Sequence, residues 1–101
     1  MSAQNLSRQL FHGTTATLKP GDIVKPKNTG RRSVAYATSN LYYAINHAQD
    51  RVTSEGAHHG NVYELEPNPS AGEASYSRYY SDKGFVVKRQ VASVLPKRGK
   101  A

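Results

Sequence analysis

The sequence predicts a small, mainly β domain of the α+β class with one main helix. Three observations support this: short segments whose side chains alternate with a period of two, turn residues between them, and one apolar stretch at helical spacing. The chain has 101 residues, 37% of them hydrophobic, which is enough for one modest core. We expect a single domain over residues 1–101, with flexible ends at residues 1–8 and 97–101.

The first half of the chain predicts two strands and a long connection between them. A strand is expected at about residues 9–12. Residues 14–30 contain Pro20-Gly21 and Asn28-Thr29-Gly30, which are typical of turns. A second strand is expected at residues 33–38, where larger and smaller side chains alternate. One face of this strand carries Val34, Tyr36 and Thr38. The other face carries two alanines, which predicts close packing.

The main helix is expected at about residues 40–51. Ser39 is a suitable N-cap, and apolar residues follow at helical spacing. These apolar residues are Leu41, Ala44, Ile45 and Ala48. The opposite face carries Asn40, Tyr43, His47 and Asp50. The apolar face should pack on the core, and the opposite face either lines a cleft or faces solvent.

The second half of the chain predicts further strands around another long loop. Residues 61–66 alternate with a period of two until Pro67 ends the pattern. Residues 67–83 show no periodicity and predict a long loop, and long loops in compact domains are often functional. The apolar segments at residues 85–87 and 91–95 form one long strand or two short ones.

The chain is strongly basic. Fourteen Lys and Arg residues against seven Asp and Glu residues give a formal net charge of +7, which attracts polyanions or a phosphorylated ligand. The cations concentrate at residues 25–27, 31–32 and 97–100. Two interpretations remain open: a solvated surface with a disordered tail, or a nucleic-acid-binding patch.

The composition excludes several kinds of site. The absence of cysteine excludes disulfides, thiolate metal sites and thiol nucleophiles, and it fits an intracellular protein. No apolar run approaches the ~18–20 residues of a membrane-spanning helix, and the first six residues do not resemble a signal peptide. We expect a cytoplasmic monomer without a membrane partner; delivery as a toxin domain remains open.

The spacing of ionisable residues does not favour a metal site. The possible ligands are His47, Asp50, His58 and His59. No two of these histidines have the spacing that would place both on one helix face, so no metal is predicted. The possible carboxylates for glycosidase-like chemistry are Glu55, Glu64, Glu66 and Glu73. Glu64 and Glu66 share a strand face, and we expect both at the surface.

Six short motifs follow one another along the chain. They are Phe-His-Gly-Thr at 11–14, Leu-Lys-Pro-Gly-Asp at 18–22, Gly-Arg at 30–31, Tyr-Ala-Thr-Ser at 36–39, Leu-Tyr-Tyr-Ala-Ile-Asn-His-Ala at 41–48 and Gly-Asn-Val-Tyr-Glu-Leu-Glu-Pro at 60–67. In this order and spacing they resemble the rifamycin (rifampin) ADP-ribosyltransferase family, within the ADP-ribosyltransferase superfamily that cleaves NAD at its nicotinamide bond. The resemblance covers about residues 10–95. It implies a small mainly β fold of two packed short sheets and one main helix.

The resemblance implies NAD as a co-substrate. The residues that it assigns to NAD binding are His12, Gly13, Thr14, Tyr36, Tyr43, His47 and Arg31. His12 would bond the ribose next to the adenine, and Gly13 would offer its backbone to the nicotinamide amide, with Thr14 supporting the turn. Tyr36 would stack on the nicotinamide ring. Tyr43 and His47, one helical turn apart, are the candidates for the opposite wall.

The charged groups of the implied site come from loops. Arg31, or the loop that carries Lys25 and Lys27, would bind the diphosphate of NAD. Three tyrosines interleaved with one arginine could stack on an acceptor that is a base or a flat drug. These residues are Tyr76, Arg78, Tyr79 and Tyr80.

The implied reaction has an oxocarbenium-like transition state, so a carboxylate must lie near the ribose. Glu73 falls near the matching place, and Asp82 is the alternative. The chain departs from the family pattern here, because residues 69–75 stand where the rifamycin enzymes carry an acidic Asp-Asp-Pro segment. It also stops near Pro96, without the C-terminal extension that these enzymes usually add.

The predicted function is therefore that of a mono-ADP-ribosyltransferase, an enzyme of pentosyl transfer. It would move ADP-ribose from NAD to a nucleophile and release nicotinamide. The acceptor stays open between a rifamycin-like molecule, a protein and a nucleic acid. The alternative is a non-catalytic basic β domain that binds nucleic acid or another phosphate-bearing ligand. A third hypothesis keeps the fold and NAD binding without turnover.

Overall fold

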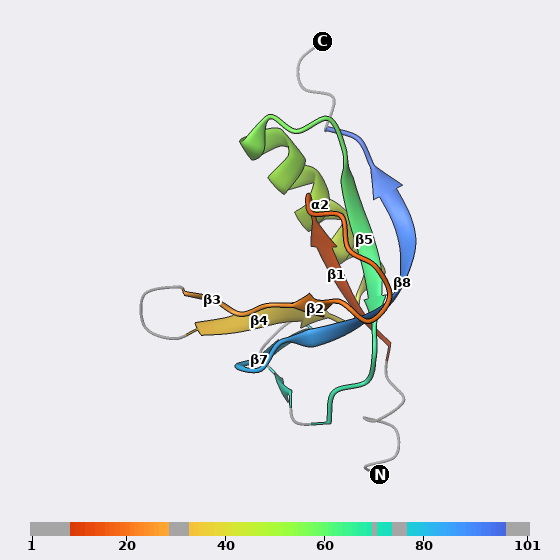
Figure 1. The fold of residues 1–101 in the computed structure, drawn as a ribbon. Coiled ribbons are helices and arrows are strands. Elements are labelled where there is room, and N and C mark those ends of the chain that lie inside the picture. Colours follow the sequence, from red (N-terminus) through yellow and green to blue (C-terminus); the bar gives the residue numbers. More distant parts are fainter. Residues whose placement is uncertain (1–8, 29–32, 70, 74–76, 97–101) are drawn as a thin grey trace.

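The structure, a computed structural model, describes residues 9–28, 33–69, 71–73 and 77–96 (Figure 1). Its elements in chain order are β1 (Leu10–Thr14), β2 (Ile23–Val24), β3 (Lys27–Asn28), β4 (Ser33–Thr38), α2 (Leu41–Glu55), β5 (Gly60–Leu65), β6 (Gly72–Glu73), β7 (Arg78–Ser81) and β8 (Phe85–Val94). The ends expected to be flexible, residues 1–8 and 97–101, lie outside the described residues.

The strands form one hydrogen-bonded path in the order β2-β8-β5-β1-β4-β7-β6, with β3 attached to β4. Every strand pair along it is antiparallel. The predicted α+β class, a mostly antiparallel sheet with one helix, is thus confirmed for the described residues. Figure 1 shows β1, β5 and β8 running alongside one another, while β4 and β7 run across them.

The two halves of the sheet meet at a narrow junction. β1 pairs with β5 through five registered residues but with β4 only through Phe11 opposite Thr38. Beyond that pair β1 and β4 diverge, which explains the change of strand direction in Figure 1. α2 packs against β1 and β5.

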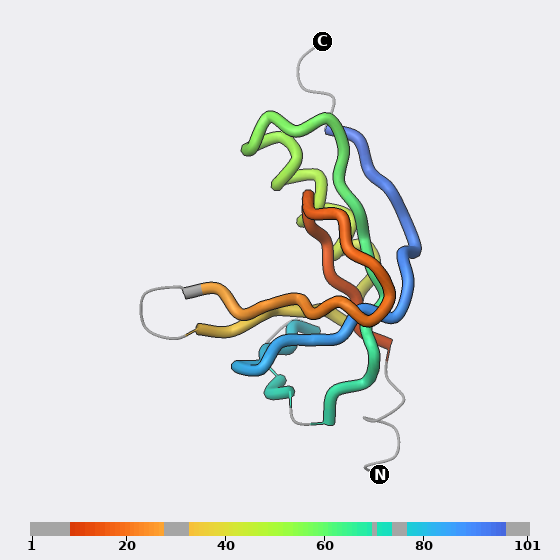
Figure 2. Tube along the Cα trace, viewed as in Figure 1, coloured from red at the N-terminus to blue at the C-terminus, as the bar shows by residue number. Residues whose placement is uncertain are grey.

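Two apolar clusters lie on opposite faces of β1. The helix-side cluster is built from Phe11, Ala44, Ala48, Val52, Val62 and Val94. The outer cluster contains Leu10, Val24, Ala35, Ala37, Tyr63, Leu65, Phe85 and Val87. Leu10 and Phe11 belong to different clusters because successive strand side chains point to opposite faces. Figure 2 shows the connection from β1 to β2 descending alongside β5, and the Tyr63 hydroxyl bonds it through Leu18 N and Ala16 O.

The predicted helix start and end are both corrected. Asn40, not Ser39, is the N-cap, because its side-chain oxygen accepts hydrogen bonds from the N–H groups of Tyr42 and Tyr43 at 2.9 and 3.3 Å. The helix continues to Glu55 and is capped by Gly56 in the left-handed region, at φ 67°. The sequence pattern did not predict this last turn because residues 53–55 are polar, although Val52 continues the buried face.

The two predicted loops contain short strands. β2 and β3 lie in the segment expected to be a loop at residues 14–30, and β6 and β7 lie in the loop expected at residues 67–83. Three of these strands have only two residues, so no periodicity could reveal them. The segment at residues 85–95 forms one long strand, β8.

The prediction that Glu64 lies at the surface is wrong. Its side chain is buried, and its carboxylate accepts hydrogen bonds from Arg89 Nε at 2.7 Å and Gln9 Nε2 at 3.3 Å, with Lys88 Nζ 3.8 Å away. The Arg89 bond keeps the pKa of Glu64 below its usual value, although burial opposes this shift. Glu66 is exposed, as expected. Among the described residues, no helix has the length and apolar character needed to cross a membrane.

Candidate functional site

The divergence of β1 and β4 leaves part of one edge of β4 without a strand partner. β7 lies along one edge and pairs with residues 35–38 of β4. Along the other edge β3 pairs with Ser33 and Val34, and β1 pairs with Thr38 (Figure 1). Pro26, just before β3, has no N–H group with which to extend that ladder. Within the described residues, the middle of this β4 edge is therefore unpaired by any strand.

His12 bonds this open edge. Its Nδ1 lies 3.0 Å from the carbonyl oxygen of Tyr36. Because a carbonyl oxygen can only accept, Nδ1 carries the proton, and Nε2 of the neutral ring is left as an acceptor. The structure thus brings together two of the residues predicted from the sequence, His12 and Tyr36.

The environment of His12 disfavours its charged form. Burial of the ring lowers the pKa of His12 from 6.5 to about 4, while the hydrogen bond to the Tyr36 carbonyl opposes this. The nearby charges of His47, Lys27 and Arg51 lower the pKa further. At neutral pH the ring is therefore an uncharged acceptor among cationic side chains.

Helix α2 contributes a row of side chains at intervals of one turn. Tyr43, which is 47% exposed, is followed by His47 and Arg51 at i+4 and i+8. Desolvation of the ring, and then the charge of Arg51, lower the pKa of His47, and Asp50 raises it. The sequence pattern indicated Tyr43 and His47 but not Arg51, although Arg51 follows His47 at the same i+4 spacing.

Gly13 and Thr14 have local structural roles. A Cβ atom built on Gly13 would lie 2.2 Å from the carbonyl oxygen of Ala44, so glycine allows α2 to approach β1. The Thr14 hydroxyl oxygen accepts a hydrogen bond from Ala16 N at 3.1 Å and stabilises the turn after β1. A contact of Gly13 with nicotinamide stays a prediction.

Neither predicted carboxylate lies in line with Tyr36 in the strand register. Register places Tyr36 opposite Tyr80, and Tyr80 opposite Gly72. Glu73 is paired with Tyr79, which is paired with Ala37, and these three residues form the neighbouring row across β6, β7 and β4. Because successive strand side chains alternate, the side chains of this row point to the face of the sheet opposite Tyr36. Asp82 is exposed in the turn after β7. Neither carboxylate shares the row of Tyr36, and the catalytic role of Glu73 stays a prediction.

The tyrosines of β7 have different surroundings. Tyr79 packs against the outer cluster, whereas Tyr80 lies beside Tyr36, which is 46% exposed. The Tyr80 ring occupies the space that a side chain at position 72 would need. Arg31 and Tyr76, two residues of the predicted site, lie outside the described residues.

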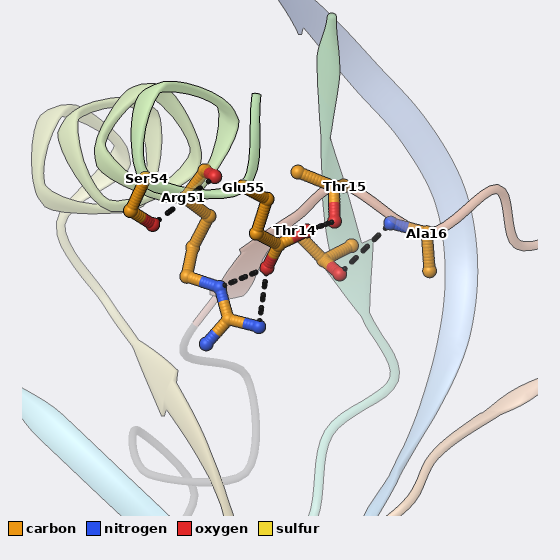
Figure 3. Close-up of polar contacts among 6 residues, drawn as sticks. All are labelled: Thr14, Thr15, Ala16, Arg51, Ser54 and Glu55. Carbon is orange, nitrogen blue, oxygen red and sulfur yellow. Dashed lines mark hydrogen bonds and ion pairs between the residues drawn. The ribbon is translucent and has the colours of Figure 1, made fainter. Parts of the chain in front are cut away.

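Hydrogen bonds among Thr15, Arg51 and Glu55 join the end of β1 to the end of α2 (Figure 3). Thr15 Oγ1 donates to one carboxylate oxygen of Glu55 at 2.6 Å. The other oxygen accepts from Arg51 Nε at 2.7 Å and lies 2.6 Å from Arg51 Nη2. The Thr15 bond, with the bond and charge of Arg51, holds the pKa of the Glu55 carboxyl below its usual value.

A metal ion needs a group of ligand side chains. Residues 9–28, 33–69, 71–73 and 77–96 contain no group of three or more His, Asp or Glu side chains arranged to hold a metal ion. No known family model matches the sequence, and no curated protein gives a significant match to it.

Proposed function

We propose that the protein is an NAD-dependent mono-ADP-ribosyltransferase whose NAD site lies where β1 and β4 diverge. The carrying observation is the hydrogen bond from His12 to the Tyr36 carbonyl, which links the two residues that the family resemblance assigns to NAD. The resemblance also suggests that the domain has the fold of these enzymes.

The chemistry of the side chains fits NAD. The neutral His12 ring offers Nε2 as an acceptor for a ribose hydroxyl. The exposed part of the Tyr36 ring offers a flat surface for nicotinamide. The permanently cationic groups whose charge reaches His12 are Lys27 and Arg51, and their positive charge would favour the diphosphate.

Transfer of ADP-ribose also needs a carboxylate near the ribose. We assign this role to Glu73 on the edge strand β6, with Asp82 as the alternative. Because Glu73 points to the face opposite Tyr36, it would have to reach the ribose around the edge of β6. The acceptor, whether a rifamycin-like molecule, a protein or a nucleic acid, would approach over Tyr80.

A second candidate function is NAD binding without turnover. The register that separates Glu73 from Tyr36 favours it. The two functions differ in one measurable product, free nicotinamide.

The test is incubation of the protein with NAD, alone and with candidate acceptors, followed by chromatography of nicotinamide. We expect release by the wild type, and a loss of about tenfold in kcat/KM for His12→Gln, since one hydrogen bond to the ribose is removed. Glu73→Gln should abolish release while NAD still binds in a calorimetric titration.

Lys19→Gln is the matched control, because Lys19 follows Leu18, which bonds Tyr63 of the outer cluster, away from α2. NAD binding without release would select the second candidate. Absence of NAD binding in the titration would overturn both, and salt-dependent binding of RNA or DNA would then favour the basic binding domain.

A further inference from the structure

The guanidinium group of Arg51 is held on one side only. Its Nε and Nη2 both face the same oxygen of Glu55. Among the described residues, Nη1 takes part in no hydrogen bond or ion pair. Figure 3 shows this end of the guanidinium pointing away from Glu55 and from the axis of α2. Two donor atoms thus orient the group, and a third is available.

Glu55 is itself fixed from a second element. Thr15, one residue after β1, donates to the carboxylate oxygen that Arg51 does not use. An isolated i, i+4 ion pair at a surface is loosely held and contributes little to stability. The Thr15 bond removes much of that freedom, because both carboxylate oxygens now have partners on different elements.

The charged groups near Arg51 come from α2 and β3. His47 lies one turn earlier on α2, and Lys27 lies on β3. The charges of Arg51 and Lys27 both act on His12 and on His47. The acidic groups that face this region are Asp50, which acts on His47, and Glu55, which is already bonded. A guanidinium group that is held in a fixed orientation and keeps an available N–H donor is one way in which proteins recognise phosphate.

We infer that Arg51 binds a phosphate group of a nucleotide diphosphate, and that Thr15 and Glu55 are positioning residues for it. Lys27 adds long-range attraction from β3. The inference deepens the proposed function and rests on it only in identifying the diphosphate as that of NAD. In this inference a residue of α2 contacts the phosphate, whereas the sequence predicted that Arg31 or the loop carrying Lys25 and Lys27 would do so.

The first test compares the binding of ADP and adenosine by isothermal calorimetry. The two probes differ only in the diphosphate. We expect the wild type to bind ADP more tightly than adenosine. Arg51→Gln should weaken ADP binding about tenfold, which is the usual effect of one charge-assisted hydrogen bond at a partly exposed site, and leave adenosine binding unchanged. Lys19→Gln removes one positive charge elsewhere and should change neither value.

The second test separates positioning from simple charge. Removing the negative charge of Glu55 would by itself strengthen anion binding. If Glu55 positions Arg51, Glu55→Gln should instead weaken ADP binding about threefold. Thr15→Val, which loses the hydroxyl, should weaken it similarly, and Thr15→Ser should restore it. Thermal unfolding of each variant checks that the fold is retained.

The outcomes separate this inference from the proposed function. Equal ADP affinity in the wild type and Arg51→Gln would overturn the inference even if nicotinamide is released. Tighter ADP binding in Glu55→Gln would overturn the positioning role. Arg51-dependent ADP binding without nicotinamide release would keep the inference and remove the transferase activity.

Discussion

The two edges of β1 differ sharply. Along one edge, five residues pair in register with β5, from Leu10 opposite Leu65 to Thr14 opposite Asn61. Along the other edge a single pair joins β1 to β4, and a side chain, His12, makes the next contact. The same five residues thus form a continuous ladder on one edge and an interrupted one on the other.

The difference between the two edges of β1 suggests that one edge contributes mainly to stability and the other mainly to ligand binding. A complete ladder satisfies its backbone groups internally and leaves little for a ligand to bond. An interrupted ladder leaves polar groups that a side chain or a ligand must satisfy. We therefore expect substitutions on the β5 edge and under α2 to change stability, and those at the β4 junction to change ligand binding.

The largest effect is expected for Gly13→Ala, beneath α2. The added Cβ would lie 2.2 Å from a backbone oxygen, so the helix must move. We expect a loss of about 3 kcal/mol in the free energy of unfolding, or about 15 °C in Tm. Gly21→Ala is the control, because its φ of 92° costs about 1 kcal/mol and no atom lies within 4 Å of the new Cβ. Equal losses would refute the packing role.

The next effect concerns the pH dependence at the β4 junction. Because the pKa of His12 falls from 6.5 to about 4 on folding, the unfolded chain binds more protons between these values. Stability from His12 is therefore complete above about pH 6.5 and is lost as the pH falls toward 4, by about 2 kcal/mol at about pH 5. Urea unfolding across this range measures it.

His12→Gln should flatten that profile. The pKa of His47 is also lowered, so His47→Gln should flatten it in the same direction but less. An unchanged pH profile in His12→Gln would show that another group titrates on unfolding.

The third prediction compares the two edges directly. Val62, opposite Gly13 on β5, is fully buried, and Val62→Ala should cost about 2 kcal/mol of stability. Tyr36→Thr, at the exposed junction, should cost no more than about 0.5 kcal/mol. It should nevertheless weaken NAD binding about tenfold. If Val62→Ala affects NAD binding as much as Tyr36→Thr does, the two edges are not functionally distinct.

The smallest effect is expected at the start of α2, which covers β1. Asn40→Ala removes the capping oxygen and should cost about 1 kcal/mol in urea unfolding. Ser39→Ala is the matched control and should change stability by less than about 0.5 kcal/mol. A larger loss of stability in Ser39→Ala than in Asn40→Ala would indicate that Ser39 is the N-cap, as the sequence predicted.

Local patterns in the sequence predicted much of the fold. The alternation at residues 33–38 and the helical spacing from Leu41 to Ala48 both gave correct elements, because each pattern spans several residues of one regular period. The burial of Glu64 was missed because its partners, Gln9 and Arg89, are 55 and 25 residues away. No local pattern carries such information.

The candidate site divides in the same way. The spacing of Tyr43 and His47 was enough to predict that they share one helix face. His12 and Tyr36 were selected as candidate site residues from the motifs that contain them. Whether Glu73 shares a face with Tyr36 depends on the register of β4, β7 and β6, and in two-residue strands the sequence does not specify it. The bond from Thr15 to Glu55 joins residues 40 positions apart.

The sequence by itself determined the class of the fold, the presence of one main helix and the positive charge. These are properties of composition and of short periodic segments. Only the tertiary structure decided that β1 is fully paired on one edge and interrupted on the other, and that a histidine fills the interruption. Strand pairing and register join distant segments, and the physical reason for them is packing of the whole chain rather than any local preference.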